Sequence, residues 1–200
     1  MVSAGALLAL LGTGCTPAAA PPPAPSADPT TVAGFDHREV AVRRAAFCDR
    51  IPDEAVAEAL AGTGPSATAT MSGYESGSRV EVASGVRDLV HEFGCTFGTG
   101  QLTVSGWVFA PPVSRARARE LARQPGCTPA DSPLDYGDPS VAVVCERAGG
   151  GREALFAGLF GDAWLSCSVS TDGPRPEQDE LVRRSARWCL AVATAAATPS

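Results

Sequence analysis

The residues of this chain best suited to chemistry are its seven cysteines. Cys15 stands apart near the N-terminus, and the other six are spread over the rest of the chain: Cys48, Cys95, Cys127, Cys145, Cys167 and Cys189. Zinc sites need close pairs such as C-x-x-C, and even the two nearest cysteines, Cys127 and Cys145, lie far apart. If the chain is exported, an even number of well-separated cysteines predicts three disulfides, with a structural metal site or free buried thiols as the alternatives.

The order of these cysteines suggests how they pair, although many pairings are open. We expect sequential pairing, because the first bond would tie a helix to a sheet and the last would hold the final helix on the preceding strand. Each bond would stabilise the fold by about 2–4 kcal/mol, by restricting the unfolded chain. The expected bonds are Cys48–Cys95, Cys127–Cys145 and Cys167–Cys189.

Cys15 ends the apolar stretch LLALLGTGC, and a Pro/Ala-rich segment follows it. An apolar core, small residues and a cysteine are typical of a bacterial lipoprotein signal, in which the cysteine becomes the lipidated N-terminus. A secretory leader without lipidation is the alternative, since no basic residue precedes the run. The run is too short for a transmembrane helix, which needs about 18 apolar residues. We therefore expect a signal peptide at residues 1–14, a lipid-bearing cysteine and tether at 15–34, and an envelope domain at 35–197.

Other catalytic groups are few. The chain has no Lys, and it lacks the G-x-S-x-G motif of a serine hydrolase. Of the two histidines, His91 is expected to face the core beside Phe93, and His37 to be solvated at the end of the tether. The 22 acidic residues leave a carboxylate pair possible, as in glycosidases, but no spacing singles one out. We assign no catalytic residue and no cofactor.

The most distinctive charged pattern is a run of arginines at helical spacing. Arg115, Arg119 and Arg123 recur every four residues, and only Glu120 lies within the run to offset them. Like charges at this spacing repel, so the run could face an anion such as a lipid headgroup, a wall polymer or an acidic partner. A solvated helix face is the alternative. The formal net charge of −6 argues against nucleic-acid binding, which requires a basic surface.

The elements that must position these residues follow from the apolar periodicity. Helices are expected from Ile51 to Gly62, from Ser114 to Gln124 and from Glu177 to about Ala195, and a long loop over Thr63–Ser78. The pattern predicts an α+β fold, an antiparallel sheet of about five strands with three helices on one face and disulfide bonds between the elements. The order is α-β-β-α-β-β-β-α, with strands expected at Leu89–Phe97, Leu102–Ala110, Ser140–Arg147, Glu153–Phe160 and from Ala163. Trp107, Phe109 and Trp164 are expected in the core, with an apolar pocket as the alternative.

Several of these segments carry a resemblance. The Cys15 signal, the tether, CDRIPDEAVAEALAG at Cys48 and GCTF at Cys95 resemble uncharacterised secreted lipoproteins of actinobacteria. WLSCSV at Cys167 and ARWCLAV at Cys189 are similar to extracellular sensor domains of actinobacterial Ser/Thr kinases. The resemblance implies an envelope location and an α+β fold, and it transfers no catalytic residue.

The expected function is that of a lipid-anchored, extracytoplasmic cell-envelope protein. Its domain would bind an envelope ligand or protein without catalysis, in a sensor-like or accessory role. The membrane would be a partner through the lipid, and nucleic acid would not. The alternatives are a carboxylate-dependent envelope hydrolase, which needs two acids in one pocket, and a structural wall-associated protein, which needs no pocket.

Overall fold

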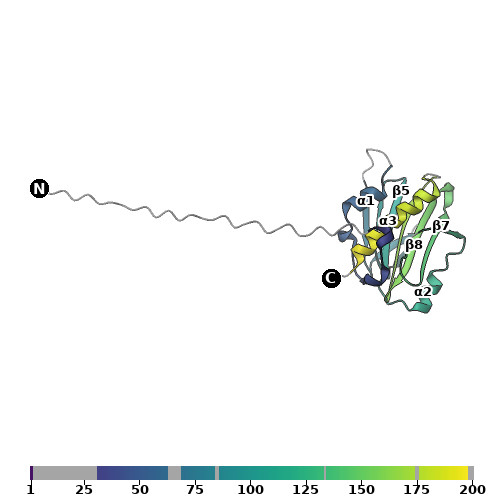
Figure 1. Ribbon diagram of the computed structural model, residues 1–200, viewed down its shortest axis with the longest axis horizontal. Helices are drawn as coiled ribbons and strands as arrows, with labels where there is room; N and C mark the ends of the chain where they lie inside the picture. The colour runs from purple at the N-terminus through teal and green to yellow at the C-terminus, as the bar shows by residue number, and fades with distance from the viewer. Residues whose placement is uncertain (2–30, 63–68, 84–85, 133, 174–175, 198–200) are drawn as a thin grey trace.

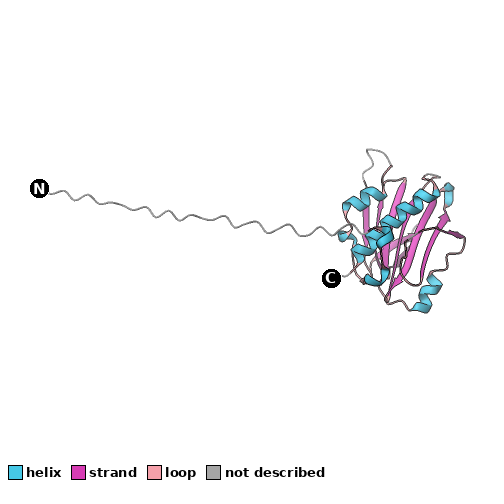
Figure 2. Ribbon diagram, viewed as in Figure 1, coloured by secondary structure: helices cyan, strands magenta, loops and turns pink. Residues whose placement is uncertain are grey.

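The computed structural model describes residues 1, 31–62, 69–83, 86–132, 134–173 and 176–197. The predicted signal peptide, Cys15 and most of the tether lie outside these residues. The described part is an α+β structure of helices and antiparallel strands (Figure 2). Its helices are α1 (Asp53–Ala59), α2 (Arg115–Leu121) and α3 (Gln178–Ala196); its strands are β1 (Thr70–Tyr74), β2 (Arg79–Ala83), β3 (Val86–Leu89), β4 (Glu92–Gly98), β5 (Leu102–Phe109), β6 (Cys127–Pro129), β7 (Ser140–Glu146), β8 (Arg152–Phe160) and β9 (Ala163–Thr171).

Seven strands form one antiparallel sheet in the order β1-β4-β5-β9-β8-β7-β6. Strands β2 and β3 pair only with each other, as a hairpin between β1 and β4 in the sequence. At the centre of the sheet Cys95 is paired with Gly106, and Gly106 with Cys167. Because side chains alternate along each strand, these residues mark one face of the sheet, the first face. Their sequence neighbours point to the second face.

Helix α3 crosses the first face and buries its apolar side there (Figure 1). Its inner side includes five residues at helical spacing that are all buried: Leu181, Ser185, Trp188, Cys189 and Val192. Asp179 and Glu180 lie in its first turn, where the positive end of the helix dipole favours acidic side chains. Helix α1 packs beside α3 and adds Val56 and Ala59 to the same hydrophobic cluster.

A glycine allows α3 to approach the sheet closely. A Cβ atom on Gly106 would lie 2.9 Å from Cγ1 of Val192, closer than side-chain carbons normally approach. Beside this contact, the Trp188 indole N–H donates to the backbone oxygen of Ser105 over 2.7 Å. The helix is therefore held on strand β5 by shape and by a hydrogen bond.

Helix α2 lies on the second face, not the first. Its Ala118 packs with Ala157, Leu159 and Trp164 in a second hydrophobic cluster, and these three strand residues alternate with first-face residues such as Phe156. The prediction of three helices on one face is therefore wrong for α2 and correct for α1 and α3. Ser114, where the helix is expected to begin, caps α2 by accepting a hydrogen bond from the backbone N–H of Arg117.

The entry segment, residues 31–47, joins the tether region to the sheet core. Phe35 lies 6.5 Å, centroid to centroid, from both Tyr136 and Phe160. Farther along, Val42 forms a β-bridge with Ala197, and Arg43 N–H donates to the Ala196 carbonyl oxygen. The segment is thus attached to the aromatic cluster at one end and to the end of α3 at the other.

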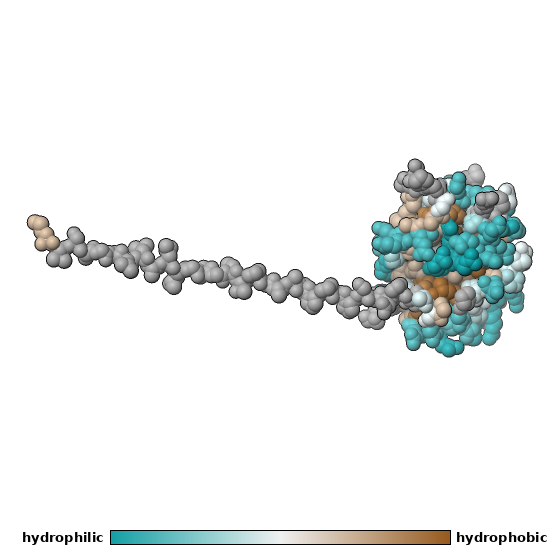
Figure 3. Space-filling view, turned by 45° about the horizontal axis from the view of Figure 1, so that its top comes forward, coloured by the Kyte–Doolittle hydropathy of each residue, from teal (hydrophilic) through white to brown (hydrophobic). Residues whose placement is uncertain are grey.

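On the side seen in Figure 3, hydrophobic residues reach the surface in separate patches among hydrophilic ones.

The sheet is larger than the five strands predicted. The loop predicted over Thr63–Ser78 is wrong for Thr70–Tyr74, which form strand β1. Strand β2 begins directly after that range, and β6 follows α2. The TMSGY sequence of β1 has no apolar alternation, and its strand conformation comes from pairing with β4. The expected strand Leu89–Phe97 divides into the end of β3 and most of β4, with Leu89 exposed.

Candidate functional site

The six domain cysteines form three disulfides, and sequential pairing is confirmed: Cys48–Cys95, Cys127–Cys145 and Cys167–Cys189, with Cα separations of 5.9, 4.3 and 5.5 Å. Two of them join first-face strands to other elements, because Cys95 lies on β4 and Cys167 on β9. Three disulfides indicate an oxidising, extracytoplasmic environment.

Two absences concern the described residues only. No described helix is long and apolar enough to cross a membrane. Within the same part of the chain, no three His, Cys, Asp or Glu side chains gather in a way that could hold a metal ion.

The arginine run lies on and just after α2, and its charges are partly compensated. One guanidinium nitrogen of Arg115 donates to both carboxylate oxygens of Asp138, at 2.8 and 2.7 Å. Arg117, between the predicted stripe residues, pairs with Glu120 at 2.8 Å. Arg119 and Arg123 are exposed and form no ion pair with another described residue. Two of the three arginines at this spacing, Arg119 and Arg123, therefore have no ion-pair partner among the described residues.

Arg115 also lines an open polar cleft of about 730 Å³, between the entry segment, α2 and the β8–β9 turn. The cleft contains both positively and negatively charged groups. At one side of it a guanidinium nitrogen of Arg44 lies 3.2 Å from a carboxylate oxygen of Asp162. Its polar lining residues are His37, Arg38, Glu39, Arg115, Asp138 and Asp162. The hydrogen bond from Arg115 is the main cause that holds the pKa of Asp138 below its ordinary value. A general acid needs a raised pKa, so Asp138 is poorly suited to donate a proton.

The burial of the two histidines is the reverse of the prediction: the His37 side chain is largely buried, and His91 is exposed. The His37 side chain is only 10% exposed, and its Nδ1 lies 3.1 Å from a carboxylate oxygen of Asp135. Its ring meets Phe160 edge-on, because the entry segment folds back on the core. His91 is exposed, since β4 begins one residue after it. Sequence reasoning missed the His37–Asp135 pair, whose members are distant in the sequence.

The second face carries hydroxyl side chains in rows across neighbouring strands. In one row Ser72 is paired with Thr96, Thr96 with Ser105, and Ser105 with Ser168. The next row has Thr70, Gly98, Thr103 and Ser170 in successive strands. We call the set Thr70, Ser72, Thr96, Thr103, Ser105, Ser168 and Ser170 the hydroxyl face. Apart from Ser168, which is buried, its members are partly or fully exposed.

Aromatic rings border the hydroxyl face on the side nearest α2. In the adjoining row Tyr74, Gly94 and Trp107 are paired across β1, β4 and β5, and the Tyr74 ring occupies the space that a Cβ on Gly94 would need. The Tyr74 hydroxyl donates to Glu92 over 2.9 Å. Burial, and then the Glu92 charge, raise the pKa of the Tyr74 hydroxyl well above its ordinary value, so Tyr74 stays neutral.

Of the three aromatic residues predicted to lie in the core, Trp164 is buried, and Trp107 and Phe109 are only partly buried. Trp164 belongs to the second hydrophobic cluster. Trp107 and Phe109 pack against that cluster, and the centroids of their two rings lie 5.0 Å from each other. They lie under α2 at the covered end of the second face. Trp107 is only partly buried and therefore also reaches the border of the hydroxyl face.

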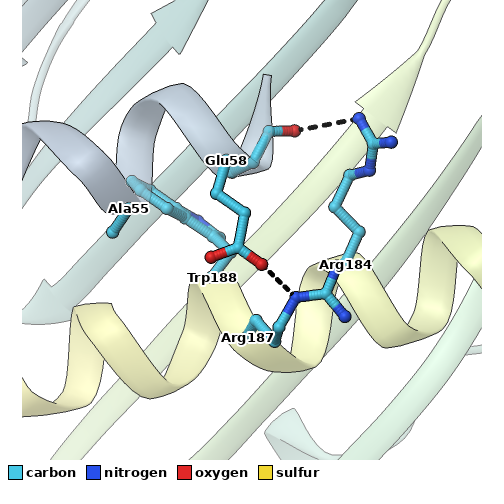
Figure 4. A pocket seen from close by; sticks show the side chains of 6 residues that line it. Ala55, Glu58, Arg184, Arg187 and Trp188 are labelled. Atoms are coloured by element: carbon cyan, nitrogen blue, oxygen red, sulfur yellow. Dashed lines mark hydrogen bonds and ion pairs between the residues drawn. The ribbon is translucent and has the colours of Figure 1, made fainter. Parts of the chain in front are cut away.

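A smaller cavity between α1 and α3 has no room for a ligand (Figure 4). It measures about 10 Å³, close to the minimum for one water molecule. Arg187 binds Glu58 across it, and Arg184 donates to the Ala59 carbonyl oxygen at 3.3 Å. These contacts hold α1 on α3 and make the cavity part of the packing between helices.

Comparison with known proteins does not narrow the choice among these sites. No protein-family model, curated protein or solved structure matches this chain. The resemblance to actinobacterial lipoproteins and kinase sensor domains stays a prediction. The polar cleft and the hydroxyl face are therefore compared on their geometry and chemistry alone.

Proposed function

We propose that this chain is a cell-envelope protein, attached to the membrane by a lipid on Cys15, whose domain binds a ligand or partner without catalysing a reaction. Three disulfides fit the extracytoplasmic side of a membrane. The observation that carries the binding role is the hydroxyl face, an accessible and uncharged surface on a rigid sheet beside the α2-covered half of the second face. A sensor-like or accessory role belongs to the same proposal.

The rigidity of this surface supports binding over a purely structural role. Ser105 and Ser168 are linked by a hydrogen bond of 3.0 Å between their hydroxyl groups, and their strands are paired along most of their length. A site on paired strands is held in place more accurately than a site on loops. A ligand would therefore meet hydroxyl groups whose positions are already set.

The lipid anchor is tested by the intact mass of the protein from the membrane fraction of cells that express the full chain. The expected mass is that of a chain beginning at Cys15 with added acyl groups, and Cys15→Ala should lack them and leave the membrane. Masses with and without a reductant should differ by the hydrogens of three disulfides. A wild-type protein that is cleaved but carries no acyl group would contradict the anchor.

The non-enzymatic role is tested by incubating the mature protein with wall glycans, esters and peptides. No turnover is expected. Turnover would favour the second candidate, an envelope hydrolase, for which the polar cleft offers Glu39, Asp138 and Asp162. In that case Asp138→Asn and Asp162→Asn should abolish the reaction, whereas Glu153→Gln, on a strand outside the cleft, should not.

A further inference from the structure

We propose that the hydroxyl face binds an uncharged, linear polysaccharide across strands β1, β4, β5 and β9. This inference rests on the binding role proposed above and names its ligand. Sugars carry hydroxyl groups around the ring edge and C–H groups on the ring faces. They are therefore bound by side chains that can donate and accept hydrogen bonds beside aromatic rings, and both occur here.

The hydroxyl groups retain capacity for a ligand. Each Ser or Thr hydroxyl can donate one hydrogen bond and accept two. The hydroxyls of Ser72, Thr96 and Thr103 form no side-chain hydrogen bond with another described residue, whereas Thr70 donates to the Gly98 carbonyl oxygen at 3.3 Å. The face thus combines oriented groups with groups that can turn toward a ligand.

The aromatic border adds the second element of sugar recognition. Tyr74 and Trp107 flank Gly94 in the row next to the first hydroxyl row, and the Tyr74 ring lies over Gly94, which has no side chain to displace it. Aromatic rings offer large apolar surfaces with a polar group at the edge. A sugar lying on the hydroxyl rows could pack its C–H face against these rings.

The lack of charge within the three rows argues against several other partners, because the nearest acidic residues, Glu92 and Glu153, lie only at the margins. The three rows contain no Asp, Glu, Lys or Arg on strands β1, β4, β5 and β9. An anionic membrane or a nucleic acid is attracted by clustered basic residues, and an acidic or basic peptide by opposite charges. A neutral polymer needs neither.

The size of the surface argues against a second copy of the chain as its occupant. Four strands at about 4.8 Å spacing and five residues at about 3.4 Å rise give roughly 14 Å in each direction. The resulting area of about 200 Å² is far below the roughly 800 Å² per partner of a stable protein interface. A polymer chain one sugar wide needs only a strip of this width.

The test is affinity electrophoresis of the full mature chain in native gels that contain a soluble neutral α-glucan, a neutral β-glucan or the anionic polymer polygalacturonate. Wild type should be retarded by at least one neutral glucan and not by polygalacturonate. Thr96→Lys places a long charged side chain in the middle of the first hydroxyl row and should weaken the binding by about tenfold or more. Thr103→Ala, which removes one hydroxyl without adding bulk, should weaken it less.

Ser140→Lys is the matched control, because Ser140 is an exposed serine on β7 outside the hydroxyl face. It should bind as wild type, and all variants should melt within a few degrees of wild type. Retardation by neither glucan, or equal binding by Thr96→Lys and wild type, would overturn the inference and leave the anchored, non-enzymatic role standing. A dimer in sedimentation that Thr96→Lys dissociates would also overturn it. Hydrolysis of the bound glucan would instead refute the proposed function.

Discussion

The close approach of α3 to strand β5 can be tested by replacing Gly106 with alanine. The new Cβ would lie 2.9 and 3.1 Å from the two methyl carbons of Val192, and 3.6 Å from the ring of Phe47. Val192 and Phe47 are almost completely buried, and a β-branched side chain has few alternative rotamers. The contact can therefore be relieved only by moving the helix or the strand.

The expected loss in the free energy of unfolding follows from two opposing effects. Overpacking of a core costs about 1–3 kcal/mol, while the lower entropy of the unfolded alanine variant returns about 0.4–1 kcal/mol. A net destabilisation of about 1–2 kcal/mol should lower Tm by about 2–8 °C for a domain of this size. Thermal unfolding followed by circular dichroism, with the disulfides intact, measures the shift.

Two further variants separate this contact from the general effect of removing a glycine. Gly73→Ala makes the same change in β1, where the nearest atom would be 3.8 Å away, and it should not lower Tm. Val192→Ala removes the methyl groups in the way, so the double variant with Gly106→Ala should lose less stability than the sum of the two single losses. Additive losses, or a Gly106→Ala protein as stable as wild type, would refute the packing argument.

Three other changes have definite expected outcomes. Ser114→Ala removes the cap of α2 and should cost about 1 kcal/mol in urea unfolding, whereas Ser114→Thr should keep most of it. Because Arg115 lowers the pKa of Asp138, their pair stabilises the fold at neutral pH and loses that effect as acid protonates the carboxylate. The Tm difference between wild type and Asp138→Asn should therefore shrink as pH falls, and a constant difference would contradict it. Replacing Cys127 and Cys145 together by serine should cost about 3 kcal/mol in non-reducing urea unfolding, for a sequence separation of 18 residues.

The cysteine spacing predicted more of this structure than any other pattern. Cys145 and Cys167 lie on strands that the apolar alternation identifies, and Cys189 lies on the inner side of a periodic helix, so sequential pairing agreed with the elements around each bond. Ser114 was equally informative, because a capping side chain acts within its own turn. In local patterns of this kind the interacting residues lie close together in the sequence, so the sequence alone can predict them.

The sequence could not predict features that depend on distant pairing. Strand β1 is polar and exists through its register with β4, in which Ser72 is paired with Thr96. The same register aligns Thr96 with Ser105, so the hydroxyl face is a product of strand order and not of any one segment. The sequence predicts a solvated His37, because no residue near it indicates that the chain folds back toward Asp135.

The entry segment also determines how the fold would respond to mechanical force. A pull on the chain before residue 31 would act first on Val32, which packs against the core, and on Phe35, whose ring packs against Tyr136 and Phe160. If those contacts gave way, the segment could peel from the core only as far as Cys48, which is covalently joined to Cys95. The disulfide would then transfer the load directly to strand β4 within the sheet. Extension under tension would end after about sixteen residues at roughly 3.4 Å each, or about 55 Å. The released length would include Phe47, which is buried beside Gly106 and Val192, so the core would open at this one edge of α3.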